Sequence, residues 1–504
     1  MHARAVQEKL GSSPEGADVA TGWTEQAEAH ASGQSPEPHG ESKAGSVRLA
    51  VLCCAAVSGR RPATPEAARE SPRSRVAPLR DPVTITLDGE PIVAERGEPI
   101  AAALVAAGKL MVARSPKFHR PRGPSCFRAA CDGCLARVDE TPNVMTCMTP
   151  AREGTAVVSQ NRLGPRQIDL LRMTDWFFPE GLDHHELFAG IPGVQNVMQA
   201  FARRVAGLGR LPAEGTPPRA AARRDADVVV VGAGPSGMAI ASRLARAGRA
   251  VEVLDDQDAP GGGLTALDAD DASSFSEIHA SFMDLVARGR VRLRTSTIAG
   301  GVYGRDLLVS GPEGAEILLA RALVLASGAH DGVLAFEGND VPGLMSARAG
   351  GWLLRRGVLL GPRVVVVIPE GGGPFGASYA RAMARATMQR QGKHAPTVTV
   401  VQGTPLRIKG SSRVKGVVVM TAAGKEEALA ADAVLVDAPR SPAYELATQA
   451  GATVRHEPRG YVVVTDGGRA AEGVYAVGEL AGCPLDAAAV DADAARAAAT
   501  ILSV

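Results

Sequence analysis

Four of the seven cysteines in this sequence stand close together. These four are Cys126, Cys131, Cys134 and Cys147. The pattern C-x4-C-x2-C followed by one later cysteine is typical of plant-type [2Fe–2S] clusters, whose irons need four soft thiolate ligands. Gly123 and Gly133 let the backbone fold closely around such a cluster, with its N–H groups turned toward the sulfurs. The spacing therefore predicts a [2Fe–2S] site.

A structural zinc site is the alternative for these cysteines, because four thiolates also bind Zn²⁺ tetrahedrally. Zinc ribbons usually pair two C-x2-C knuckles. Here the first gap is four residues long and Cys147 stands alone. The spacing favours the iron–sulfur cluster.

A second pattern that could do chemistry is the turn GAGPSG at positions 232–237, which follows the apolar run Asp227–Val231. A helix over 238–247 and a strand over 250–254 are predicted to follow the turn. In such a unit the glycines allow a tight turn, a close approach to a pyrophosphate and close helix packing, and the helix N-terminus attracts the phosphate charge. An acid after the second strand accepts hydrogen bonds from a ribose. The predicted dinucleotide-binding residues are Gly232, Gly234, Pro235, Ser236, Gly237 and Asp255.

Two later segments resemble motifs of flavoproteins that contain two dinucleotide-binding domains. The first is the strand that ends at Gly328, and the second is the strand that ends at Gly478 and Glu479. In those flavoproteins the acid of the second motif reaches the ribityl and pyrophosphate region of FAD. The resemblance therefore implies FAD, with Glu479 in place of the more usual aspartate.

A further nucleotide-binding unit is expected between these segments, where the strand 362–368 is followed by the glycine-rich turn 369–376. Its glycines are out of register with the pyrophosphate pattern, and the next strand, 397–401, ends in Gln402 instead of an acid. Binding of NAD(P) and a structural remnant both stay open for this unit.

The elements that position these residues form a recognisable order. Val83–Leu87, the turn Asp88-Gly89 and Ile92–Ala94 predict a β-hairpin, and 99–107 predicts a short helix before the cysteines. Hairpin, helix and cysteine loop are the order of a β-grasp ferredoxin. The fold class predicted for the whole chain is α/β, a two-dinucleotide-binding (Rossmann-like) flavoprotein preceded by a β-grasp [2Fe–2S] domain. The expected divisions are a disordered leader (1–75), the β-grasp domain (76–160), a connecting segment and linker (161–222), the FAD domain (223–335 and 451–504) and a second nucleotide-binding-like domain (336–450).

Composition excludes several classes of partner. The 504 residues carry a formal net charge of +1, so there is no overall attraction to nucleic acid or to an anionic membrane. The apolar runs are far shorter than the roughly 20 residues that span a bilayer. The apolar patch 49–57 follows more than forty polar residues and makes a poor signal peptide. We therefore expect a cytoplasmic protein without a transmembrane segment, whose leader is either disordered or not translated.

Taken together, these pieces resemble the family of the heterotetrameric sarcosine oxidase α subunit and its opine oxidase, hydroxyproline dehydrogenase and hydrogen cyanide synthase relatives. Three phrases carry the resemblance beyond the generic motifs: 114–123, 206–212 and 338–343. The sarcosine oxidase α chains generally lack the four cysteines and continue into a folate-binding domain. This sequence keeps the cysteines and is expected to carry out no folate chemistry.

The resemblance implies an electron-relaying subunit in an amine or amino-acid (sarcosine, opine or proline-like) dehydrogenase or oxidase complex. A separate flavoprotein β subunit would oxidise the amine, and an acceptor protein or a quinone would take the electrons. The substrate, the stoichiometry and an FMN at a subunit interface are left open by the sequence. No acid/base pair is assigned: His330 is interpreted as a loop histidine without a catalytic role and Cys483 as a small buried residue.

Three other functions compete with the relay. A stand-alone NAD(P)H-dependent FAD/iron–sulfur reductase is the main alternative, and the degenerate second glycine turn counts against it. A thiol–disulfide reductase is disfavoured because the C-x2-C pair, Cys131 and Cys134, lies inside the cluster motif. A noncatalytic assembly subunit is disfavoured by the four intact ligands and the intact first glycine turn.

Overall fold

The structure is a computed structural model that describes residues 75–116, 119–162, 193–194, 196–197, 200, 220–388 and 396–504. All of them fall within one unit of the chain, Pro62–Val504. The predicted leader up to residue 74 and most of the predicted linker lie outside the described residues. The predicted domain limits therefore stay predictions, and the elements below are given as the structure has them.

The N-terminal elements form a five-stranded sheet in the order β2-β1-β7-β5-β6. The predicted hairpin is present as β1 (Pro82–Leu87) and β2 (Glu90–Glu95), joined by Asp88 and Gly89 with φ of 52° and 81°. Positive φ at both turn positions gives the twist that a tight hairpin needs. The other strands of this sheet are β5 (Leu135–Val138), β6 (Thr141–Met145) and β7 (Ala156–Val158). The same part of the chain contains the helix α1 (Ile100–Ala106) and the short strands β3 (Ala113–Arg114) and β4 (Pro121–Arg122), which pair with each other. β1 pairs parallel with β7, which completes a β-grasp arrangement.

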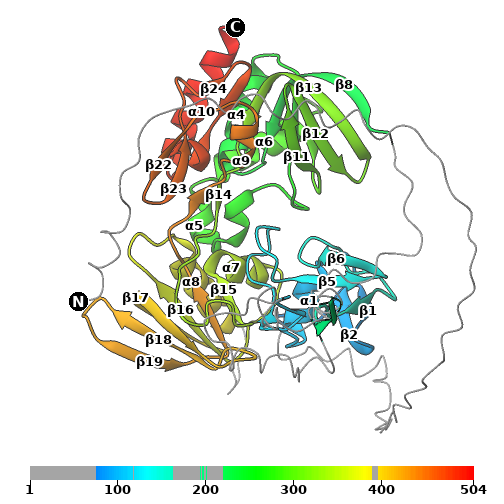
Figure 1. Cartoon of the computed structure of the whole chain (residues 1–504). Helices are drawn as coiled ribbons and strands as arrows, with labels where there is room; N and C mark the ends of the chain where they lie inside the picture. Colours follow the sequence, from blue (N-terminus) through cyan, green and yellow to red (C-terminus); the bar gives the residue numbers. More distant parts are fainter. Residues whose placement is uncertain are drawn as a thin grey trace, which may run out of the picture. The chain divides into compact units, whose positions relative to one another are not determined.

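The first dinucleotide-binding domain has a parallel sheet core in the order β10-β9-β8-β13-β25, extended by antiparallel β12, β11 and β24. Figure 1 shows β8, β13, β12 and β11 side by side in green. The strands are β8 (Ala222–Val231), β9 (Val251–Leu254), β10 (Val291–Arg294), β11 (Ile298–Tyr303), β12 (Asp306–Gly311), β13 (Gly314–Leu325), β24 (Arg469–Ala471) and β25 (Val474–Ala476). The helices are α4 (Pro235–Arg246), η2 (Gly262–Ala266), α5 (Ala269–Ser273), α6 (Ser276–Ala287), η3 (Gly478–Ala481) and α10 (Ala487–Leu502). This strand order is that of a doubly wound nucleotide-binding fold.

A second sheet, in the order β15-β20-β16-β17-β18-β19, follows the same plan over its first four strands. Its elements are β15 (Leu344–Ser346), α7 (Ala347–Arg355), β16 (Arg363–Ile368), α8 (Phe375–Met388), β17 (Thr397–Lys409), β18 (Gly416–Thr421), β19 (Glu426–Ala430) and β20 (Ala433–Val436). Smaller elements connect it to the first domain: β14 (Ala329–His330), β21 (Ser441–Pro442), α9 (Glu445–Gln449), β22 (Val454–Glu457) and β23 (Gly460–Val463). β14 pairs with β21, so the chain leaves and re-enters the first domain at one place.

Two elements differ from the sequence expectation. α4 begins at Pro235, three residues before the predicted start, because proline fits the first helical position, where its missing N–H costs nothing. β17 runs on to Lys409, well past the predicted end at 401, because its second half pairs antiparallel with β18. Apolar periodicity does not join the two halves, because the parallel half is exposed or half-buried whereas the antiparallel half contains the buried residues Pro405 and Ile408.

The cysteine loop and the dinucleotide-binding domains share one hydrophobic core. That core contains Phe127, Cys134 and Cys147 together with residues such as Val228 and Trp352. The Phe127 and Trp352 rings have centroids 5.5 Å apart. The loop that carries the cysteines is therefore packed against the flavoprotein part of the chain. Among the described residues, no helix is both long and apolar enough to cross a membrane.

Candidate functional site

The four predicted cluster cysteines come together as two pairs. The thiol of Cys126 is hydrogen-bonded to that of Cys131, and the thiol of Cys134 to that of Cys147. Within the part of the chain that the structure describes, no group of three His, Cys, Asp or Glu side chains is placed to hold one metal ion. Two pairs of thiols suit two irons with two protein ligands each, whereas a zinc ion would need all four to converge on one point.

The loop around these cysteines depends on the predicted glycines. A Cβ atom on Gly133 would lie 2.3 Å from the carbonyl oxygen of Gly123, and one on Gly123 would lie 2.1 Å from that of Leu110. Neither distance is possible for a real side chain. Backbone atoms leave no room for a side chain at either position, so both positions require glycine.

The surroundings of Cys126 favour its thiolate form, which is the form that binds metal. The hydrogen bond from the Cys131 thiol is the main cause that lowers the pKa of Cys126 to about 6, and burial opposes it. The backbone N–H groups of Arg128 and Ala130 and the charge of Arg348 lower the pKa further. The Cys147 thiol lowers the pKa of Cys134 in the same way. The loop thus provides N–H groups and positive charge where anionic sulfur is needed.

The first glycine turn has the geometry that its three glycines predict. A Cβ on Gly232, whose φ is 103°, would meet the carbonyl oxygen of Ala326 at 2.4 Å, and a Cβ on Gly237 would meet that of Gly232 at 1.9 Å. Around Gly234 the nearest atom would be 3.9 Å away, so this position is open toward a ligand. The turn therefore opens a space at the N-terminus of α4, where backbone N–H groups attract a phosphate.

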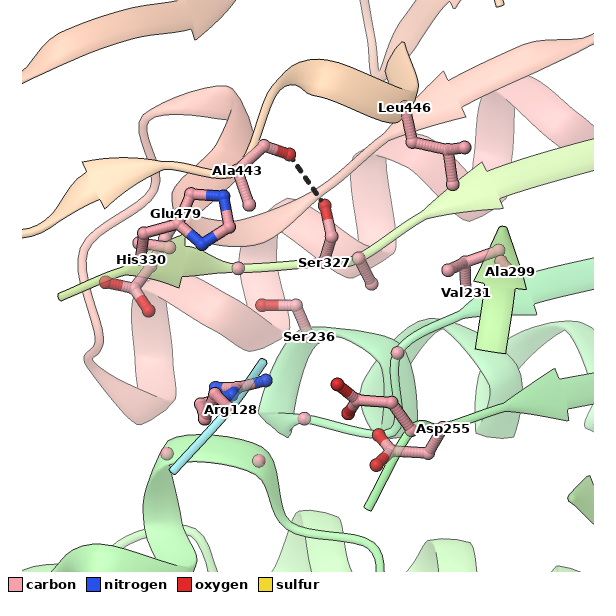
Figure 2. Close-up of a pocket in the computed structure, with 18 of the residues that line it drawn as sticks. Arg128, Val231, Ser236, Asp255, Ala299, Ser327, His330, Ala443, Leu446 and Glu479 are labelled. Atoms are coloured by element: carbon pink, nitrogen blue, oxygen red, sulfur yellow. Dashed lines mark hydrogen bonds between the residues drawn. The ribbon is translucent and has the colours of Figure 1, made fainter. Parts of the chain in front are cut away.

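A cavity of about 340 Å³ lies at this turn (Figure 2), and residues of the cysteine loop also line it. Seven of the predicted cofactor-binding residues line it: Gly232, Gly234, Pro235, Ser236, Asp255, Gly328 and Glu479. The other two are structural neighbours of the cavity. Gly237 packs against Gly232, and the Gly478 N–H donates to the carboxylate of Asp493 at 2.8 Å.

Asp255 holds the glycine turn together. Its carboxylate accepts hydrogen bonds from the backbone N–H groups of Ala233 at 2.6 Å and Gln257 at 2.9 Å. Burial, and secondarily the neighbouring Asp256, raise the pKa of Asp255 to about 6. A carboxylate has further acceptor sites, so a ribose contact by Asp255 stays a prediction. Asp256 also lines the cavity and is a second acid that the sequence pattern did not single out.

On the opposite side of the cavity, Glu479 forms an ion pair with Arg440 at 2.5 Å, and burial raises the pKa of Glu479. The Ser327 hydroxyl donates to the carbonyl oxygen of Ala443 at 2.9 Å, as Figure 2 shows. His330 lies at the edge, with its Nε2 3.1 Å from Glu445, and its side chain is 41% exposed. His330 is the last residue of the short strand β14 and not a loop residue as expected, and its lack of a catalytic role stays a prediction.

Sequence reasoning missed the arginines that connect the two predicted sites. Arg348 is buried, pairs with Asp331 at 2.6 Å and donates to the backbone oxygen of Cys126 at 3.3 Å. Arg128, inside the C-x4-C loop, lines the dinucleotide cavity. The cysteine motif marks the position of Arg128 in the chain, but nothing in its spacing tells which way the side chain points.

The second glycine turn is occupied by a side chain of the protein. The carboxylate of Asp437, at the end of β20, accepts a hydrogen bond at 2.7 Å from the N–H of Gly376 in the first turn of α8. A Cβ on Gly373 would lie 2.8 Å from the same carboxylate. Burial raises the pKa of Asp437 to about 6. An acidic side chain thus lies where a pyrophosphate would otherwise approach the helix N-terminus.

Two families of known domains match consecutive parts of the chain. Residues 80–162 match the 2Fe-2S iron-sulfur cluster binding domain, and residues 226–406 match the pyridine nucleotide-disulphide oxidoreductase family. The expected [2Fe–2S] and FAD cofactors are thereby confirmed. The donor set fits them: two thiol pairs for the cluster, and an open glycine turn at a helix N-terminus for the dinucleotide.

Curated relatives agree with the resemblance drawn from the sequence. The sarcosine oxidase subunit alpha of Rhizobium meliloti is 31% identical over 306 residues, which are 56% of this chain and 31% of that one. The corresponding subunit of Corynebacterium sp. (strain P-1) is 28% identical over 326 residues, 59% of this chain and 29% of that one. This chain thus spans about a third of the length of these relatives.

Among solved structures, L-proline dehydrogenase from P. horikoshii superposes with a TM-score of 0.64 at 19% identity, over 86% of this chain and 75% of that chain. At this identity the match shows a shared fold. The chain is therefore an FAD-dependent oxidoreductase with a [2Fe–2S] domain, related to the α subunits of sarcosine oxidase.

Proposed function

We propose that this chain is the electron-relaying subunit of an amine or amino-acid dehydrogenase or oxidase complex. A separate flavoprotein β subunit oxidises a sarcosine-, opine- or proline-like substrate, and this chain passes the electrons to an acceptor protein or a quinone. The names of the relatives support the substrate class, since they are subunits of sarcosine oxidase and the solved structure is a proline dehydrogenase.

One observation carries the proposal. Arg128 and Ala130 of the cysteine loop line the same cavity as Gly234 and Ser236 of the dinucleotide turn. The two cofactor sites are thus neighbours in one unit of the chain, as a protein that moves electrons between them requires. A chain whose sites were vestigial would have no reason to keep four thiols and an open glycine turn together.

The residues of this chain have separate tasks in such a relay. When bound, FAD exchanges two electrons and the cluster exchanges them singly. The glycine turn and the N-terminus of α4 bind the pyrophosphate, while Asp255 keeps the turn in shape. The pairs Cys126–Cys131 and Cys134–Cys147 hold the irons, and the shared core around Phe127 excludes water between the two sites.

The alternative of a stand-alone NAD(P)H-dependent reductase needs a working second nucleotide site. Asp437 counts against it, because its carboxylate already binds the N-terminus of α8 and would repel a pyrophosphate. A thiol–disulfide reductase is likewise disfavoured. Cys131 and Cys134 are committed to separate thiol pairs in the cluster loop.

The two functions separate in one anaerobic experiment on the purified, cofactor-loaded chain. NADH or NADPH is added first, and then the chain is mixed with an amine-oxidising flavoprotein subunit and its amine. We expect the flavin absorbance to stay unchanged with either nicotinamide and to bleach only with the partner and the amine together. Rapid bleaching by NADH or NADPH alone would establish the stand-alone reductase.

A further inference from the structure

The cysteine loop has a conformation that sends neighbouring side chains in opposite directions. Phe127 and Ala129 both have left-handed backbone conformations, with φ of 53° and 54°, which non-glycine residues rarely adopt. Phe127 is buried in the shared core, with its side chain against Trp352. Arg128, between them, lines the dinucleotide cavity. Figure 2 shows its side chain extending toward the side of the cavity where Ser236 and Asp255 lie.

One arginine that lines this cavity has no ion-pair partner among the described residues. Three arginines line it: Arg128, Arg348 and Arg440. Arg348 is paired with Asp331 and Arg440 with Glu479. For the Arg128 side chain the structure gives no hydrogen bond or ion pair within the described ranges. Burial raises the pKa values of Asp255 and Glu479, and the charge of Arg128 opposes part of that rise.

A dinucleotide brings two more negative charges into a cavity that already contains Asp255, Asp256 and Glu479. The N-terminus of α4 offers only about half an elementary positive charge. A guanidinium with five donors and no partner, placed beside this helix start, matches a pyrophosphate in charge and in geometry. No other cationic side chain that lines the cavity is unpaired among the residues the structure describes.

We propose that Arg128, carried on the cluster loop, binds the pyrophosphate of FAD, so that cluster assembly and FAD binding strengthen one another. Because Cys126 and Cys131 flank Arg128, a bound cluster fixes the loop that presents the guanidinium. Linkage then requires the reverse effect: bound FAD holds the loop and protects the cluster. This inference rests on the two cofactors and not on the partner or substrate proposed above.

The first test measures FAD affinity by flavin fluorescence after FAD is removed from the cluster-loaded protein and added back. Replacing Arg128 with Gln keeps the backbone N–H that faces Cys126 and removes the charge. We expect the FAD dissociation constant to rise about tenfold to a hundredfold, the factor for one charge-assisted hydrogen bond. Arg305→Gln, at an exposed position outside the cavity, is the matched control and should leave the constant unchanged. Cluster content is checked by the EPR signal of the reduced protein.

The linkage gives a second readout. Removing the cluster from the wild type should weaken FAD binding, whereas removing it from the Arg128→Gln variant should have little further effect. If the loaded variant binds FAD within about twofold of the wild type, or if cluster removal weakens both proteins equally, Arg128 is not the link.

A variant that fails to assemble its cluster does not end the test, because the wild type can report directly. Phenylglyoxal modifies exposed arginines, and peptide mass spectrometry locates the modification. We expect added FAD to protect Arg128 and to leave Arg305 reactive. Equal modification of Arg128 with and without FAD would overturn the proposal.

Discussion

The buried pair Arg348–Asp331 lies where the cysteine loop meets the flavoprotein part of the chain, and its loss should be costly. The guanidinium and the carboxylate form two hydrogen bonds of 2.6 Å, with side chains only 5% and 12% exposed. Burial is the largest single influence on Asp331 and alone would raise its pKa, but the charge and hydrogen bonds of Arg348, with smaller contributions from Ser346 and Arg128, together hold the pKa below its usual value. Arg348→Met therefore leaves a buried carboxylate without its charged partner.

Removing one member of a buried pair typically costs about 3–5 kcal/mol of unfolding free energy. The double variant Arg348→Met/Asp331→Leu removes both charges, and its free energy of unfolding should lie only about 1–2 kcal/mol below that of the wild type. The remaining loss reflects the hydrogen bond from Arg348 to the Cys126 oxygen, which is also removed. Arg223–Asp306 is a matched control, because it is also bidentate, at 2.7 and 2.8 Å, but its side chains are 56% and 28% exposed. Arg223→Met should cost at most about 1 kcal/mol.

The assay is anaerobic urea unfolding of all four proteins with the same excess of FAD, because bound cofactor adds to the apparent stability. Midpoints are compared between variants, since cofactor release accompanies unfolding. Equal losses for Arg348→Met and Arg223→Met, or no recovery in the double variant, would refute the reasoning.

Three further predictions concern single residues. Gly133→Ala should lose iron and sulfide, because its Cβ would lie 2.3 Å from the Gly123 oxygen, whereas Gly237→Ala should lose flavin, because its Cβ would lie 1.9 Å from the Gly232 oxygen. Flavin and iron contents are measured in each variant, so that each variant is the control for the other. Equal loss of flavin and iron in the two variants would contradict the assignment. For Asp255, burial raises the folded-state pKa to about 6, above the unfolded value of about 3.9. The folded state therefore binds more protons between these values, and this contribution to stability, complete below about pH 4, is lost as the pH rises through 6. Asp255→Asn should flatten the fall in melting temperature between about pH 4 and 6, and an unchanged pH profile would count against this prediction.

The sequence predicted the elements whose geometry is local. The cysteine spacing, the paired positive φ of Asp88 and Gly89, and the crowding at Gly237 all follow from patterns within a few residues. The same holds for Asp255, whose place at the end of β9 brings it to the glycine turn.

The features that could not be predicted depend on contacts between distant parts of the chain. Arg348 is 222 residues from Cys126, and Asp437 is 61 residues from Gly376. Periodicity and motif spacing carry no information about such pairs. The glycines of the second turn are out of register, which indicated that this turn differs from the first one. Only the structure shows that a carboxylate lies where a phosphate would bind.

Central to the proposed function is that one chain holds both FAD and a [2Fe–2S] cluster. An anaerobic titration of the purified protein with dithionite, followed by absorbance and EPR with a metal analysis, tests it most directly. We expect about three electron equivalents per chain, two for FAD and one for the cluster, with iron as the metal. About two equivalents, no EPR signal from a reduced cluster and zinc in place of iron would contradict it.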